Sequence, residues 1–97
     1  MALISDLNDA FEAALAATRR ERSAGMTCAD GSSAVAKLDQ LERELVDAKE
    51  RALRHGVVDR EWFQKTVRWV VEWVPESELT LIAALGRIVR ANPSTLA

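Results

Sequence analysis

The sequence predicts an all-α protein, a small bundle of four helices arranged as two antiparallel helical hairpins. In four separate segments apolar residues recur every three or four positions, which is the spacing of helices with one buried face. No convincing strand pattern lies between these segments. The connections are short and carry glycine or proline, and short connections favour antiparallel neighbours. A chain of 97 residues is expected to form one domain around a single core.

The first helix is expected over residues 4–23. Its apolar positions follow a 3-4-3 spacing, typical of a narrow coiled-coil-like seam, at Ile4, Leu7, Phe11 and Ala14. Thr18 occupies the next seam position and weakens the pattern. Gly25 ends the helix, and the small, polar residues 25–33 predict a mobile loop.

The second helix is expected over residues 33–55, with Ser32 or Ser33 as its N-cap and Gly56 at its end. Its seam has 4-3-4-3-4 spacing and consists of Ala34, Leu38, Leu41, Leu45, Ala48 and Ala52. Acids placed four residues before bases predict a solvated outer face, with the pairs Asp39–Arg43, Asp47–Arg51 and Glu50–Arg54.

The third helix, expected over residues 60–74 between the N-cap Asp59 and Pro75, is the most informative segment. Its three tryptophans fall within an arc of about 40° on a helical wheel. A second apolar strip lies about 80–180° from the first tryptophan and consists of Phe63, Val67, Val70, Val71 and Val74. The two strips cover more than half of the circumference, whereas a surface helix needs an apolar stripe of about 100°. This helix is therefore either central in its bundle or offers its tryptophan edge to another molecule.

The fourth helix is expected over residues 77–91 and is two-sided. Glu76 and Glu78 lie where the positive end of its dipole would be, and Pro93 begins a flexible tail over residues 93–97. The apolar face consists of Leu81, Ile82, Leu85, Ile88 and Val89.

The tryptophan edge predicts a non-enzymatic protein–protein interaction module: an adaptor, an inhibitor or an assembly factor. Tryptophan is enriched where interfaces draw most of their binding energy, so Trp62, Trp69 and Trp73, with Lys65 and Glu72 beside them, are the expected partner-binding residues. The partner would be another protein, a second copy of this chain in a homodimer, or both. The competing interpretation is that two of the three tryptophans only fill the core.

A small DNA-binding transcriptional regulator is the alternative function. Helices 60–74 and 77–91 would form a helix-turn-helix, with Arg87 and Arg90 on the recognition helix. Recognition helices contact bases through their N-terminal residues, and here that end carries Glu76 and Glu78. The net charge of −2 also lacks the basic excess of a nucleic-acid footprint. Both observations argue against a nucleic-acid partner.

The residues indicate no catalytic site, no metal site, no cofactor and no small-molecule substrate. Cys28 and His55 are expected at opposite ends of the second helix, about 30 Å apart at 1.5 Å per residue. No cysteine or histidine spacing suits a metal, and no Gly-Lys-Ser/Thr motif follows the loop glycines. A single cysteine, an N-terminus without a signal-peptide pattern and the lack of a long apolar stretch predict a cytoplasmic protein that does not enter the membrane.

Overall fold

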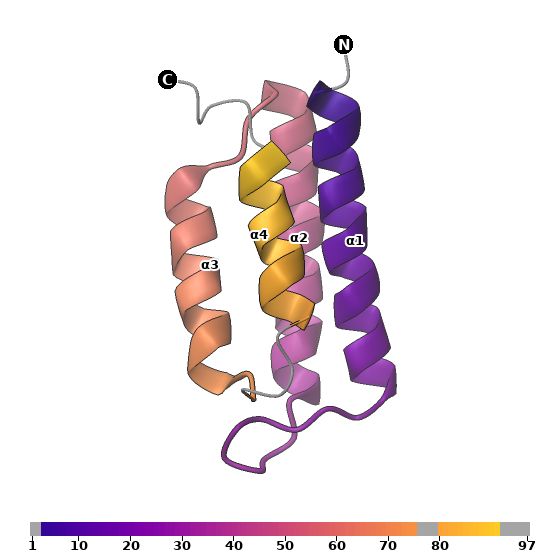
Figure 1. Cartoon of the computed structure of the whole chain (residues 1–97), viewed down its shortest axis with the longest axis vertical. Coiled ribbons are helices and arrows are strands. Elements are labelled where there is room, and N and C mark those ends of the chain that lie inside the picture. Colours follow the sequence, from indigo (N-terminus) through magenta and orange to yellow (C-terminus); the bar gives the residue numbers. More distant parts are fainter. Residues whose placement is uncertain (1–2, 76–79, 92–97) are drawn as a thin grey trace.

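The described residues form four helices, as the sequence predicts, and no strand. The computed structural model describes residues 3–75 and 80–91, with side chains described from residue 6 onward. The helices are α1 (Leu3–Ser23), α2 (Val35–His55), α3 (Arg60–Trp73) and α4 (Thr80–Ala91). Successive helices alternate in direction along the long axis of the bundle, and α3 lies at its outer edge (Figure 1).

Helix α1 is the centre of the packing, because its backbone runs close to both α2 and α4. Its buried face is therefore wider than the predicted seam. Thr18 is fully buried, and its hydroxyl donates to the Ala14 carbonyl at 2.7 Å, so a polar residue continues the seam without an unsatisfied group. The side chain of Ile4 lies outside the described part. The buried residues of α1 are Leu7, Ala10, Phe11, Ala14, Leu15, Ala17 and Thr18.

The line of contact between α1 and α2, called here the closed seam, forms as its small and aliphatic residues predict. All the seam residues predicted for the second helix are buried, including Ala34, which directly precedes α2: Ala34, Leu38, Leu41, Leu45, Ala48 and Ala52. Alanines permit the close approach of two backbones, and leucines fill the space between them. Helix α4 packs onto the other side of α1 through Leu81, Ala84, Leu85 and Ile88.

Ion pairs brace the closed seam on its outer side. Arg19 Nε lies 2.6 Å from Glu42 Oε2, and Arg22 bonds both Glu42 and Asp39, the latter at 2.9 Å. The two guanidinium groups, Arg19 first, lower the pKa of Glu42 below its ordinary value. The predicted Asp39–Arg43 pair is wrong, because Asp39 turns to α1 instead of along its own helix.

The start of α3 confirms its predicted cap. Asp59 Oδ1 accepts the backbone N–H of Glu61 at 3.0 Å and of Trp62 at 3.4 Å. The start of α2 differs from the prediction of a serine cap. Ala34 occupies the cap position without a side-chain hydrogen bond, while Ser33, one residue earlier, accepts the Val35 N–H on its Oγ at 3.3 Å and forms an antiparallel bridge with Thr27.

Residues 25–33 form a hydrogen-bonded turn packed onto the bundle. Gly25 adopts a left-handed φ of 72° after α1, and Met26 and Cys28 are buried. The Ala29 N–H donates to the Trp73 carbonyl at 2.9 Å, which ties the turn to the end of α3. The mobility predicted for this loop stays a prediction. Glu76, Glu78 and the tail 93–97 lie outside the described residues.

Candidate functional site

The tryptophans line the boundary between α2 and α3, called here the open seam. The α2 and α3 backbones come close at few positions, in contrast to the close approach of α1 to α2 and α4. Helices packed by small side chains lie about 8–10 Å apart, and indole rings are too large for that spacing. Trp62 and Trp69 line the space left between α3 and α2.

Trp62 crosses the open seam from the core to the surface. Its ring lies 6.4 Å from that of Phe11, measured between centroids, and its indole Nε1 donates to Glu44 Oε1 of α2 at 3.1 Å. One end of the side chain is thus apolar and the other reaches a solvated carboxylate. Amphipathic placement of this kind is typical of tryptophan at interfaces.

Trp69 and Trp73 behave differently, although they are one turn apart. Trp73 is only 5% exposed, while Trp69 is half-buried and meets it edge-on at 5.3 Å between centroids. The buried Nε1 of Trp73 finds no acceptor among the described residues. The two interpretations of the tryptophans therefore divide by residue: Trp73 belongs to the core, and Trp62 and Trp69 reach the surface.

The face of α3 that packs against the rest of the bundle lies between its tryptophan strip and its valine strip. Thr66 and Val70 are buried at the middle of this face, whereas Val71, at the far edge of the valine strip, is 56% exposed. The wide apolar arc therefore has two uncovered edges, one at Trp69 and one at Val71. Helix α3 is peripheral and not central, so the arc exceeds what its own bundle covers.

Three hollows follow one another along the open seam. The upper hollow, about 300 Å³, is lined by Ala48, Arg51, Ala52, His55, Val57, Asp59 and Trp62. The middle hollow, about 200 Å³, is lined by Gln40, Glu44, Trp62, Lys65, Thr66 and Trp69. The lower hollow, about 150 Å³, is lined by Cys28, Ala29, Asp30, Lys37, Glu72 and Trp73.

The five residues predicted to bind a partner all lie along this seam. Lys65 borders the middle hollow and pairs with Glu61 at 3.1 Å on the exposed side of α3. Glu72 is exposed at the lower hollow, close to the turn 25–33. The structure thus places Trp62, Lys65, Trp69, Glu72 and Trp73 on one side of α3, where Lys65 and Glu72 are exposed and Trp73 is buried.

Sequence reasoning missed the polar residues that α2 contributes to the open seam. They recur at helical spacing beside the leucine seam, and they are Lys37, Gln40, Glu44, Arg51 and His55. Ala48 and Ala52 also line the upper hollow, although they belong to the predicted seam with α1. The periodicity of the polar residues was available in the sequence. Nothing in it indicated that a tryptophan helix would lie over this polar stripe, because the choice of neighbour depends on tertiary packing.

The remaining candidate groups do not assemble into a second site. Cys28 is buried in the turn at the lower end of α2, with its thiol 3.9 Å from the Ser33 carbonyl, and His55 ends the same helix on the other side. No cluster of three or more histidine, cysteine or carboxylate side chains suited to a metal is present in residues 6–75 and 80–91. None of the described helices is long and apolar enough to cross a membrane.

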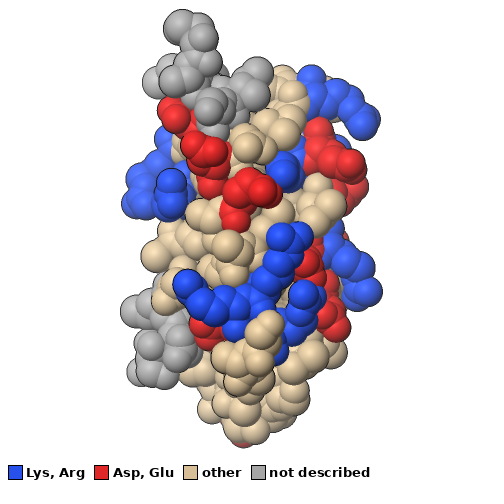
Figure 2. Space-filling model, turned by 90° about the vertical axis from the view of Figure 1, so that its right-hand side faces the viewer, with Lys and Arg blue, Asp and Glu red and all other residues tan. Residues whose placement is uncertain are grey.

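Basic and acidic side chains both occur on the face viewed in Figure 2. Blue side chains gather across the middle and lower part of that face, with red side chains above and beside them, and Arg19 and Arg22 near the end of α1 are paired with acids of α2. Arg87 and Arg90 are exposed on α4. Mixed charge of this kind gives a weak electrostatic attraction for a phosphate backbone.

The chain matches no protein family, and comparisons with curated proteins and with solved structures give no significant match.

Proposed function

We propose that this chain is a non-enzymatic helical interaction module that binds protein through the open seam, and that its first partner is a second copy of itself. The observation that carries the proposal is the half-exposure of Trp62 and Trp69 along a seam that the bundle leaves open. An adaptor, inhibitor or assembly factor built on such a homodimer would act through the same surface.

The chemistry of the middle hollow supports this proposal. Its base is aromatic and apolar, while Gln40, Glu44 and Lys65 at its border supply polar groups. Interfaces combine a desolvated aromatic centre with a polar rim in this way. The indole of Trp62 is already held by Glu44, so little side-chain freedom would be lost on binding.

The test is the molar mass of the purified chain, measured by light scattering over a range of concentrations. The wild-type chain is expected to dimerise, and Trp69→Ala is expected to weaken dimerisation by at least about tenfold, since hot-spot truncations cost about 2 kcal/mol or more. Val71→Ala is the matched control, because it removes an exposed apolar side chain from the other edge of α3.

Two results would overturn the proposal that the chain dimerises through the open seam. A chain that stays monomeric at every concentration has no self-association to explain. A dimer that survives Trp69→Ala but is lost in Val71→Ala uses the valine edge. Circular dichroism of each variant shows whether it remains folded, so that a loss of binding is not mistaken for unfolding.

A further inference from the structure

The upper hollow combines an apolar base with two opposite charges, an arrangement that protein docking does not require. Its base consists of the methyl groups of Ala48 and Ala52 with one side of the Trp62 indole, and its volume of about 300 Å³ is at the lower end of the range for small-ligand sites. The sequence predicts no small-molecule ligand, because these groups come from α2, α3 and the connection between them and meet only in the fold.

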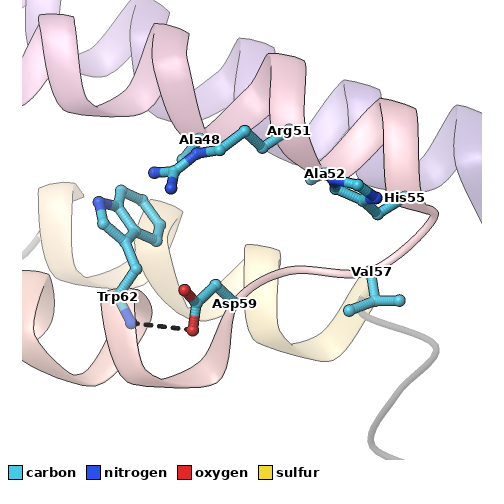
Figure 3. A pocket seen from close by; sticks show the side chains of 7 residues that line it. All are labelled: Ala48, Arg51, Ala52, His55, Val57, Asp59 and Trp62. Atoms are coloured by element: carbon cyan, nitrogen blue, oxygen red, sulfur yellow. Dashed lines mark hydrogen bonds between the residues drawn. The ribbon is translucent and has the colours of Figure 1, made fainter.

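Two opposite charges border this space. Arg51 extends from α2 and Asp59 from the start of α3, on opposite sides of the volume beside the Trp62 indole (Figure 3). They form no ion pair with each other. Arg51 pairs instead with Asp47 one turn earlier in α2, whose Oδ2 lies 3.0 Å from Nη2.

The polar groups of the hollow are held in place and retain unused bonding capacity. Asp59 Oδ1 is fixed by the N–H groups of Glu61 and Trp62, and its second oxygen has no partner among the described residues. Arg51 has five N–H donors, of which Asp47 takes the bond at Nη2. On one side of the apolar base, Arg51 can therefore donate hydrogen bonds to a carboxylate of a ligand. On the other side, Asp59 can accept hydrogen bonds from an ammonium group.

We propose that the upper hollow binds a zwitterion with an apolar side chain, namely a free amino acid such as phenylalanine. Its carboxylate bonds Arg51, its ammonium group bonds Asp59, and its side chain lies on Ala48, Ala52 and Trp62. A ligand that is only an anion would bond Arg51 but lie close to the negative charge of Asp59. A ligand that is only a cation would bond Asp59 but lie close to the positive charge of Arg51, so both kinds of ligand are disfavoured.

The experiment follows the indole Nε1–H resonance of Trp62 by NMR while L-phenylalanine is added to millimolar concentration. We expect a saturable shift. Two analogues isolate the charges: 3-phenylpropionate lacks the ammonium group and 2-phenylethylamine lacks the carboxylate. Each is expected to bind about tenfold more weakly or worse, since a charge-assisted hydrogen bond is lost.

Two variants remove the charge of Asp59 or of Arg51 without unfolding the protein. Asp59→Asn keeps an N-cap, because asparagine caps as well as aspartate, but removes the charge, so it should weaken phenylalanine binding by about tenfold. Arg51→Gln should do the same, while Arg54→Gln, an exposed arginine outside the hollow, should leave binding unchanged. The proposal is overturned if phenylalanine causes no saturable shift, or if all three probes bind equally.

Discussion

The closed seam and the open seam share helix α2 and differ in almost everything else. Toward α1 the side chains of α2 are alanine and leucine, these residues are buried and ion pairs brace the edge. Between α2 and α3 the backbones come close at few positions, and three hollows lined by tryptophan remain. One helix thus has a face used for stability and a face left available for binding. The size of the side chains packed against α2 distinguishes the face toward α1 from the face toward α3.

The largest effect is expected from emptying the closed seam. Leu45 is fully buried, so Leu45→Ala should lower the free energy of unfolding by about 2–5 kcal/mol through lost burial and a residual cavity. Chemical denaturation measures it. Val46→Ala, at a neighbouring residue that is 41% exposed, should stay within about 0.5 kcal/mol. Equal losses at both positions would show that the seam is not the stabilising contact.

Adding volume should separate the two seams most clearly. Ala14→Leu enlarges a buried residue of α1 and should cost about 1–3 kcal/mol of unfolding free energy, since a packed contact cannot accept extra methylenes. Val57→Leu adds a methylene at a residue that lines the upper hollow and is 40% exposed, and it should cost less. If the two substitutions destabilise the protein equally in thermal or chemical unfolding, the upper hollow is packed as tightly as the closed seam.

Helix α3 should depend on its cap, because it lies at the edge of the bundle. Asp59→Ala leaves the N–H groups of Glu61 and Trp62 without their acceptor and should lower the free energy of unfolding by about 1 kcal/mol. Asp59→Asn should recover most of that loss in the same denaturation experiment. A loss as large in the asparagine variant would point to the charge of Asp59 and not to capping.

The smallest effect concerns the ion pairs that brace the closed seam. The pKa of Glu42 is lowered by Arg19 and Arg22, so its stabilising contribution is present above its ordinary pKa of 4.5 and is lost as the pH falls through the lowered value. Denaturation between about pH 6 and about pH 3 should therefore show a smaller acid-dependent loss for Glu42→Gln than for wild type. The difference should be about 1 kcal/mol or less, as for exposed pairs. Identical pH profiles would mean that the pairs contribute nothing.

The closed seam could be predicted from sequence because its information is local. A 4-3-4-3-4 spacing of alanine and leucine specifies both the buried face of α2 and a close approach, and all those residues are buried. Asp59 as the cap of α3 followed from the same kind of local rule.

The open seam could be predicted only in part. The arc of Trp62, Trp69 and Trp73 was visible in the sequence, but the inward direction of α3 passes through Thr66, a polar residue that is 6% exposed. Hydrophobic periodicity gives the width of an apolar face and does not say which edge its neighbours leave uncovered. The α2 lining and the upper hollow depend on that pairing, so no segment taken alone reveals them.

The most direct test of the open seam as the interaction surface is a map of the residues that respond to self-association. NMR spectra of the ¹⁵N-labelled chain, recorded on dilution, should show changes at the indole Nε1–H of Trp62 and Trp69 and at the amides of Gln40, Glu44 and Lys65. The amides of Leu7 and Leu45 in the closed seam should stay constant. Changes confined to α1 and α4, or no change on dilution, would contradict the account.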